Sequence, residues 1–526
     1  RQMGRDKFLH GAMILTLAGL VVKIIGSVNR ILLSRLLGGE GIGLYQMAYP
    51  VYLLLLAISS AGIPVAISIV VSRYLAKDDV GNVRRVFHLS LRLMSLLGLV
   101  LALALVLAAG WLVDSGVIKD GRAYYSLVAL APAVFFGTVL ASFRGLFQGH
   151  QLMTPPAVSQ ILEQFIRVVT MVVLAYVLLP YGLEYAAAGA AFGAVPGSLM
   201  GMVVLGCFYR YYRKRWLAEA ELRPCREELS SSKLVKELLL LALPVSCANV
   251  LVPVTNSIDV LLVPGYLIES GFTVEQATTL FGYLAGMAQP LLLLATIPTM
   301  SLATSLVPAI AEAYTLKQTD IITAKATTAM KLCCLITVPA AVGMAVLAEP
   351  ISLLLYGTAK AGTAIMHSAP SLWFLGMHQV TTGMLQGMGH SNLPMLHMLA
   401  GIIAKLFAVC QLTNATLNIA GAAWATNINF GLTALLNILA LRYYKISFRW
   451  YNILKIIVAA GLMGLLAWWA HGLLLVKLGM VLATIAAMLL AALFYAALLC
   501  ALQVLTKQEL QQLPLVKKIV QKRKKA

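Results

Sequence analysis

Apolar runs of about 20 residues recur along the whole chain, separated by short polar segments. The runs do not alternate apolar and polar residues, so they predict helices rather than the strands of a closed barrel. A backbone surrounded by lipid must also satisfy its own hydrogen bonds, as a helix does. The pattern predicts an all-α polytopic membrane protein with about fourteen transmembrane helices. We expect them at residues 8–36, 44–72, 86–113, 123–148, 157–180, 186–209, 236–264, 278–311, 327–348, 366–388, 394–413, 418–441, 451–474 and 478–503.

The first apolar run, residues 15–39, carries charged residues on one face. At 100° per residue, its polar and small residues form a stripe roughly 100° wide. The stripe consists of Thr16, Gly19, Lys23, Gly26, Ser27, Arg30 and Ser34. Because charge in lipid is costly, we interpret this stripe as facing protein or a water-filled cavity. The alternative is that the basic side chains snorkel to an interface, which we expect for Arg35 near the end of the run.

An internal repeat divides the chain into two similar halves. Residues 131–150, APAVFFGTVLASFRGLFQGH, resemble residues 369–388, APSLWFLGMHQVTTGMLQGM, and the same offset pairs Arg167 with Lys405. Both repeats begin on the same side of the membrane, which predicts two parallel six-helix repeats plus two C-terminal helices. The predicted parts are an N-terminal lobe (1–215), a cytoplasmic linker (216–233), a C-terminal lobe (234–447), two additional helices (448–505) and a basic cytoplasmic tail (506–526).

Charge is scarce and unevenly distributed. Charged residues make up 11% of the chain and the formal net charge is +20. Most Lys and Arg residues fall in alternate loops, which predicts cytoplasmic N- and C-termini and argues against nucleic-acid binding. The basic tail is expected to be attracted to anionic membrane lipids.

The fifth predicted span carries a second polar stripe. Its members are Gln160, Glu163, Gln164, Arg167 and Thr170. Glu163 and Arg167 are four residues apart, so we expect them to pair, either as a structural ion pair or as part of a site. Lys405, the repeat mate of Arg167, has no acidic residue nearby in its own helix, which favours a functional role. For Arg144 we leave two possibilities open, a cavity mouth or interfacial snorkelling.

The seventh predicted span is interrupted by prolines and carries a polar band that includes Asn249, Asn256 and Asp259. A bent helix with Asn and Asp at membrane depth is typical of a binding site. When the two repeats are aligned, Asp259 falls at the position of Arg30. The two side chains could therefore face each other, either as a gate or as a structural ion pair.

Cations outnumber acids in the predicted membrane interior. Lys23, Arg30, Arg144, Arg167 and Lys405 stand against Glu163 and Asp259. Left unpaired, each central charge would cost about 2.5–3.5 kcal/mol, so such a cluster favours an anionic substrate. Phosphate and diphosphate are well matched by converging Lys and Arg donors.

We find no pattern that predicts an enzyme, a cofactor or a metal site. The eight His residues are dispersed, and there is no Walker motif or Gly-rich phosphate loop. The seven Cys residues show no ligand-like spacing.

The first two spans carry a pattern known from one superfamily. Lys23-x-x-Gly26-x-x-x-Arg30, the segment SRLLGGEGIGLYQ and the turn AGIP at residues 61–64 resemble the multidrug/oligosaccharidyl-lipid/polysaccharide (MOP) exporter superfamily. The resemblance is to its polysaccharide transporter branch, with stage V sporulation protein B-like members and MurJ-type lipid II flippases as relatives. MurJ-type proteins have an arginine-rich first helix, whereas this chain has Lys23 and Asn29, with Arg30 shifted by one, so cavity contacts cannot be copied across.

The resemblance implies two six-helix lobes around a cationic cavity, alternating access, and an undecaprenyl-diphosphate-linked sugar as cargo. It also implies that the last two helices form a groove for the lipid tail and that the protein lies in a bacterial cytoplasmic membrane. We therefore predict a flippase that moves a lipid-linked anionic glycan precursor, such as a lipid II-like peptidoglycan precursor, to the outer leaflet. Na⁺ or H⁺ coupling stays open, and a monomer is expected. The alternatives are a cation-coupled multidrug exporter and a membrane enzyme acting on polyprenyl phosphates.

Overall fold

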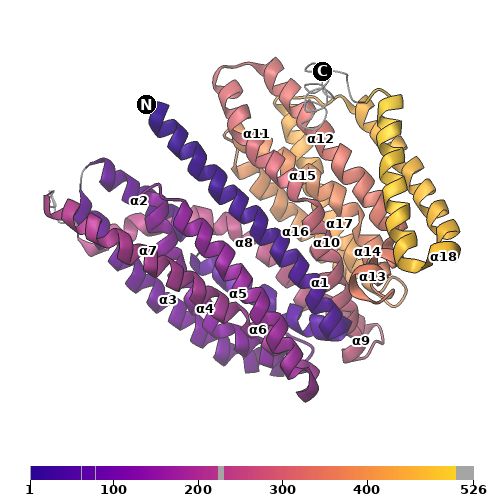
Figure 1. Ribbon diagram of the computed structural model, residues 1–526, viewed down its shortest axis with the longest axis horizontal. Coiled ribbons are helices and arrows are strands. Elements are labelled where there is room, and N and C mark those ends of the chain that lie inside the picture. The colour runs from indigo at the N-terminus through magenta and orange to yellow at the C-terminus, as the bar shows by residue number, and fades with distance from the viewer. Residues whose placement is uncertain (1, 61, 78, 223–229, 505–526) are drawn as a thin grey trace, which may run out of the picture. The chain divides into compact units, whose positions relative to one another are not determined.

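The computed structural model describes residues 2–504 apart from 61, 78 and 223–229. The described residues are almost entirely helical and contain no β-strand, so the predicted all-α class is confirmed. The helices form two compact units (Figure 1). Unit 1 comprises residues 1–294 with 409–422, and unit 2 comprises residues 295–408 with 423–526.

Unit 1 contains the helices of the first part of the chain. They are α1 (Gln2–Ser60), α2 (Ile63–Ala76), α3 (Val80–Asp114), α4 (Ala123–Gly149), α5 (Thr154–Leu178), η1 (Leu179–Tyr181), α6 (Leu183–Phe192), α7 (Ala194–Leu222), α8 (Ser231–Glu269), α9 (Val274–Phe281), the π-helix η2 (Gly282–Ala288) and α10 (Gln289–Ala295). Within this unit α1 packs against α4, α5, α8 and η2.

Unit 2 contains most of the remaining helices. They are α11 (Ile297–Thr315), α12 (Thr319–Val346), α13 (Ala348–Tyr356), α14 (Gly362–Ser368), α15 (Pro370–Gly387), α16 (Asn392–Leu412), α17 (Ile419–Tyr443) and α18 (Trp450–Ala501). Residues 409–422, which comprise the end of α16, the loop after it and the start of α17, belong to unit 1. The short helix α13 falls between two predicted spans.

Ten helical segments among the described residues are long and apolar enough to cross a membrane, against the fourteen predicted spans. Two of the ten, Leu17–Ala76 and Trp450–Ala501, each cover two predicted spans. They are interrupted at Gly38 (φ 67°) and Gly479 (φ 72°), in a backbone conformation that glycine adopts without steric cost. The predicted spans 236–264 and 366–388 are helical but are not among the ten.

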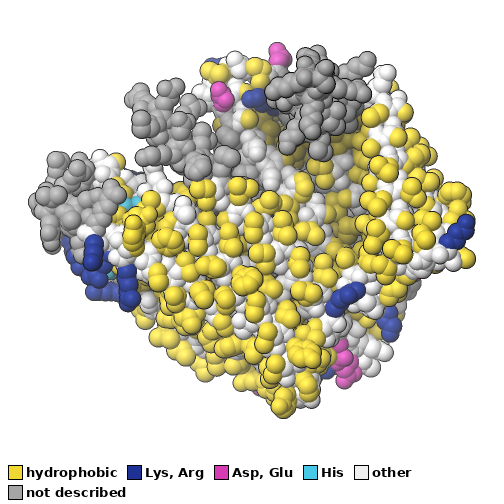
Figure 2. All heavy atoms as spheres, in the orientation of Figure 1, with side chains coloured by type: hydrophobic (Ala, Val, Ile, Leu, Met, Phe, Trp, Pro, Cys, Tyr) yellow, Lys and Arg dark blue, Asp and Glu magenta, His cyan; other side chains and the backbone are white. Residues whose placement is uncertain are grey.

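The surface of the helices is apolar, as a lipid-facing surface must be. Hydrophobic side chains cover most of the face seen in Figure 2, and Lys and Arg side chains gather near its margins. In α3 and α18, side chains such as Leu107 (80% exposed) and Val476 (88% exposed) point away from the protein. Exposure of this kind is stable only against hydrocarbon.

Each unit contains the same close helix crossing, built on a pair of glycines four residues apart. In unit 1, a Cβ added at Gly145 would lie 3.0 Å from the Pro64 carbonyl oxygen, and one at Gly149 would lie 3.1 Å from the Ser68 oxygen. The glycines therefore allow α4 to touch the backbone of α2, as in the GxxxG contacts of membrane helices.

In unit 2, Gly383 and Gly387 of α15 make the equivalent approach to α11. Added Cβ atoms would lie 2.8 Å from the Ala303 oxygen and 2.7 Å from the Val307 oxygen. These two carbonyls lie 239 residues after their counterparts in unit 1. The sequence repeat is therefore also a repeat of backbone contacts.

Candidate functional site

A cluster of three charged side chains lies between α4 and α5. Glu163 accepts hydrogen bonds at Oε1 from Arg167 Nη2 (2.8 Å) and at Oε2 from Arg144 Nη2 (2.6 Å). The predicted pair of Glu163 and Arg167 is therefore present. Arg144 donates to the same carboxylate, which is an ion pair that the sequence did not predict.

Helix α7 packs closely over this cluster because it presents glycines there. A Cβ at Gly197 would lie 2.9 Å from Arg167 Cβ, and one at Gly201 would lie 3.3 Å from Glu163 Oε2. The Arg144, Glu163 and Arg167 side chains are only 23%, 14% and 13% exposed, respectively. Charges this well covered are kept only if they are paired.

The cluster keeps spare positive charge and spare donors. Two guanidinium groups share one carboxylate, which leaves an excess charge of one. Within the described part of the chain, the Nε atoms of Arg144 and Arg167 are buried without a hydrogen-bond partner. A buried donor left unsatisfied costs about 1–3 kcal/mol, which an anion or water could recover.

Arg30 is held by residues of its own helix, beyond the kink at Gly38. Its Nη1 donates to Gln46 Oε1 at 2.7 Å, and its guanidinium carbon lies 4.9 and 4.7 Å from the ring centroids of Tyr45 and Tyr49. Such cation–π contacts stabilise a charge that is partly removed from water. These partners were not predicted from the sequence, because they lie beyond the break in α1.

The Gln46 side chain that accepts from Arg30 also connects it to η2. Gln46 Nε2 donates to the Ala285 carbonyl of the π-helix η2. π-Helical turns of this kind are frequent at functional sites.

The rest of the predicted stripe on α1 divides between protein and open surface. Gly26 lies against Gln164 of α5, since an added Cβ would be 3.3 Å from its amide nitrogen. Ser34 Oγ donates to the Gly286 carbonyl at 3.3 Å, and the neighbouring Asn29 Nδ2 donates to Met171 Sδ at 3.2 Å. Lys23 is exposed, as is Arg35, which lies off the stripe.

Helix α8 contributes a buried acid. Asp259 is 1% exposed and accepts a 3.4 Å hydrogen bond from Gln289 Nε2, whereas Asn256 is half-buried. The Asn249 side chain lies outside the described residues. The Arg30 contacts given above lie within α1, so the juxtaposition of Arg30 with Asp259 stays a prediction.

Lys405 lies in unit 2, on a polar face shared by α16 and α17. It is fully buried and has an interaction partner. Two turns earlier on α16, His397 Nδ1 lies 2.7 Å from Asn437 Oδ1. Between them, a Cβ at Gly401 would lie 2.3 Å from Thr433 Oγ1, so the two helices are in close contact.

A second ion cluster in unit 1 lies outside the predicted spans and was missed from the sequence. Arg122 donates to Asp120 Oδ2 (2.8 Å) and to Glu40 Oε1 (2.6 Å), and Thr278 Oγ1 donates to Asp120 (2.8 Å). Burial alone would raise the pKa of Asp120, but the hydrogen bonds from Arg122 and Thr278 outweigh burial and lower it. The hydrogen bonds that Arg122 donates to Asp120 raise the pKa of Arg122. The cluster joins the α3–α4 loop to α1 and α9.

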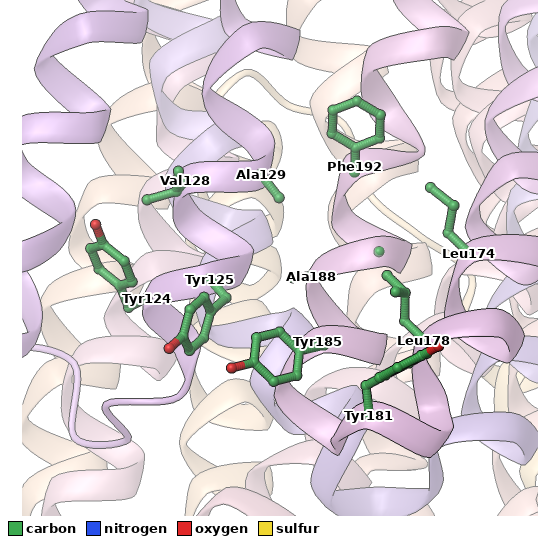
Figure 3. A pocket seen from close by; sticks show the side chains of 11 residues that line it. Tyr124, Tyr125, Val128, Ala129, Leu174, Leu178, Tyr181, Tyr185, Ala188 and Phe192 are labelled. Atoms are coloured by element: carbon green, nitrogen blue, oxygen red, sulfur yellow. The ribbon is translucent and has the colours of Figure 1, made fainter.

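Two cavities are nearly free of polar groups. A cavity of about 700 Å³ in unit 1 is lined by aromatic and aliphatic side chains of α4, α5 and α6, among them Tyr124, Tyr125 and Tyr185 (Figure 3). One of about 560 Å³ in unit 2 includes Trp373, Trp424 and Trp450. Neither contains a charged side chain, so they suit hydrocarbon rather than an anion.

The described residues contain no group of His, Cys, Asp or Glu that could hold a metal ion.

Comparison with known proteins finds two family matches. Residues 8–314 match the family described as "Polysaccharide biosynthesis protein", and residues 284–409 match "MatE". The first match covers more than half of the chain.

Individual relatives agree with these matches. The chain is 29% identical to stage V sporulation protein B of Bacillus subtilis (strain 168), over 83% of each chain. It is 26% identical to lipid II flippase MurJ of the same organism, over 76% of each. A solved structure of lipid II flippase MurJ in an inward closed conformation has the same fold, with a TM-score of 0.69 at 14% identity, covering 93% of this chain and 99% of that one.

Proposed function

We propose a function from one premise: this chain belongs to the polysaccharide biosynthesis protein family of the MOP superfamily. One of its relatives, of which a solved structure has the same fold, is named a lipid II flippase. We infer that this chain is a flippase for an undecaprenyl-diphosphate-linked oligosaccharide or peptidoglycan precursor, which it carries from the inner to the outer leaflet by alternating access.

The observation that carries this proposal is the excess of guanidinium groups in unit 1. Arg144 and Arg167 share Glu163, and Arg30 has no carboxylate among its described partners, only Gln46 and tyrosine rings. A diphosphate can accept the donors that these contacts leave unused, in a charge-assisted hydrogen bond. A cationic drug would meet repulsion at the same place, which favours the flippase over a multidrug exporter.

We assign roles on the same basis. Arg30 and Arg167, with Arg144 beside them, would contact diphosphate or anionic sugar, and Glu163 would hold the two arginines in place. Lys23 and Lys405 would add positive charge along the path. Asp259 would act as a counter-charge or gate, with Asn249 and Asn256 as sugar-binding amides.

Two further features fit this cargo. With the termini in the cytoplasm, as the loop charges predict, an anion would move outward down the membrane potential by about 2.3 kcal/mol per charge per 100 mV. The apolar cavity of α15, α17 and α18 offers hydrocarbon-sized space of the kind a polyprenyl tail needs.

The test is translocation of a fluorescent lipid-linked precursor in vesicles that contain the purified full chain. We expect Arg30→Ala to lower the initial rate at least tenfold and Arg30→Lys to keep part of it, because a lysine keeps the charge but loses the fork of donors. Arg35→Ala is the matched control, since Arg35 is exposed and lies off the stripe. Full activity of Arg30→Ala would refute the proposed site.

The rival within the superfamily is a multidrug exporter, which the MatE match at residues 284–409 keeps in consideration. The same vesicles, given a cationic dye and an ion gradient, distinguish the two functions. Dye efflux without precursor translocation would overturn the flippase assignment.

A further inference from the structure

A small basic pocket lies where α2 ends and α8 begins. Its volume is about 370 Å³. It is lined by Arg73, Lys233, Lys236, Glu237, Leu240 and Leu241. Three cations and one carboxylate give it an excess charge of two, which none of the roles assigned above uses.

One of the three cations is already neutralised. Arg73 Nη1 donates to Glu237 Oε1 at 2.5 Å and closes one wall of the pocket. Lys233 and Lys236 are both exposed and lie three residues apart, so they project from the same side of α8. The charge available to a ligand is therefore that of these two ammonium groups.

The position of the lysines in α8 is electrostatically unfavourable without a ligand. The first turn of α8 contains no acidic residue, and Lys233 stands within it. A helix N-terminus carries partial positive charge and favours anions rather than cations. The side chain of the N-cap residue Ser230 accepts a hydrogen bond from the Lys233 amide, at 3.4 Å. An anion in the pocket would relieve both the repulsion between the lysines and their conflict with the helix dipole.

In the turns of α8 that follow the lysines, leucine side chains are exposed. Leu239, Leu240 and Leu243 are 55%, 63% and 64% exposed, about one to two turns further along the helix. The opposite side of the same turns, Leu234 and Leu238, is buried in the core with α2. Charge and exposed hydrocarbon therefore follow each other along α8 in the order of a lipid headgroup and its chains.

We propose that this pocket binds an anionic diacyl phospholipid of the inner leaflet, with its phosphate between Lys233 and Lys236 and an acyl chain along Leu240. The inner leaflet follows from the predicted cytoplasmic position of the segment between α7 and α8. Basic pockets at the cytoplasmic ends of membrane helices bind such headgroups. The lipid is a bound partner of unit 1, distinct from the cargo, and its binding does not depend on flipping.

The experiment measures lipid preference of the purified full chain in bilayer nanodiscs. Spin-labelled phosphatidylglycerol and phosphatidylcholine report the association constant of each lipid relative to the bulk. For the unmodified chain we expect phosphatidylglycerol to be preferred at least tenfold. Lys233→Gln/Lys236→Gln should reduce this preference to within about twofold of unity, since each lysine near the surface contributes a factor of about five.

Two further variants make the result specific. Glu237→Gln removes the one opposing charge and should raise the preference severalfold. Lys317→Asn/Lys445→Asn removes two exposed charges elsewhere, at left-handed positions that Asn tolerates, and should leave the preference unchanged. An equal loss in both double variants would mean diffuse attraction to the surface and would overturn the pocket.

A competition experiment with inorganic phosphate distinguishes a lipid headgroup from free phosphate as the ligand. We expect phosphate at about 10 mM, a large excess over the protein, to leave the bound lipid in place, because the ion lacks the hydrocarbon contacts. Displacement would show a site for free phosphate and overturn the lipid assignment. A retained preference in a chain without flippase activity would refute the proposed function and leave this inference standing.

Discussion

The charge cluster on α5 gives a sharp test, because one carboxylate serves two arginines. The perturbation is Glu163→Gln, which keeps the shape of the side chain and removes its charge. Both ion pairs are short, at 2.6 and 2.8 Å, and all three side chains are less than a quarter exposed. For charge centres about 4 Å apart and an effective dielectric constant of 20, each pair corresponds to about 4 kcal/mol of attraction before desolvation is subtracted.

The net effect is smaller than the sum of the two attractions, because folding has already removed the charges from water. Breaking a buried pair by removing one partner costs about 3–5 kcal/mol, and here the removal leaves two arginines facing each other. We expect the free energy of unfolding in detergent micelles to fall by that amount. Arg144→Gln leaves the Glu163–Arg167 pair intact and should cost only about 1.5–3 kcal/mol.

The assay is denaturant unfolding followed by circular dichroism, with Glu269→Gln as control because Glu269 is exposed at the end of α8. The predicted order of destabilisation is Glu163→Gln, then Arg144→Gln, then the control. If Glu163→Gln costs no more than the control, the cluster is not held together by this carboxylate and the reasoning fails.

Two other features of the fold lead to measurable predictions. Gly149→Ala and Gly387→Ala should each destabilise by about 1–3 kcal/mol, since the new Cβ would lie 2.6 Å from Val71 and 2.7 Å from the Val307 oxygen. Gly110→Ala, where nothing lies within 4 Å, should be neutral or slightly stabilising in thermal unfolding, and equal effects at all three sites would contradict the close crossings. Because the pKa of Asp120 is lowered by folding, its contribution to stability is present above the unfolded pKa of about 3.9 and is lost as pH falls through the lower folded value. Unfolding midpoints between pH 7 and 3 should therefore fall less steeply for Asp120→Asn, and identical slopes would refute this.

Much of the fold follows from hydrophobic patterning, because lipid-facing helices have few other ways to satisfy their backbone. The Glu163–Arg167 pair is equally local, since four residues make one turn. Arg144 could not be added to it from the sequence, because its contact with Glu163 depends on how α4 packs on α5. The tyrosines around Arg30 depend in the same way on the bend at Gly38. The glycines at 38, 39, 41 and 43 predict a break between the first two spans, but they do not specify its angle.

The bend of α1 at Gly38 determines which groups contact the Arg30 guanidinium. Arg30 lies before the bend, and the groups that hold its guanidinium lie after it. Straightening α1 would withdraw the arginine from its rings, and an anion that competes for the arginine would loosen the bend. By thermodynamic reciprocity, the bend angle must then alter affinity for that anion by the same factor. Occupancy of the anion site and the angle of α1 at Gly38 are therefore thermodynamically coupled.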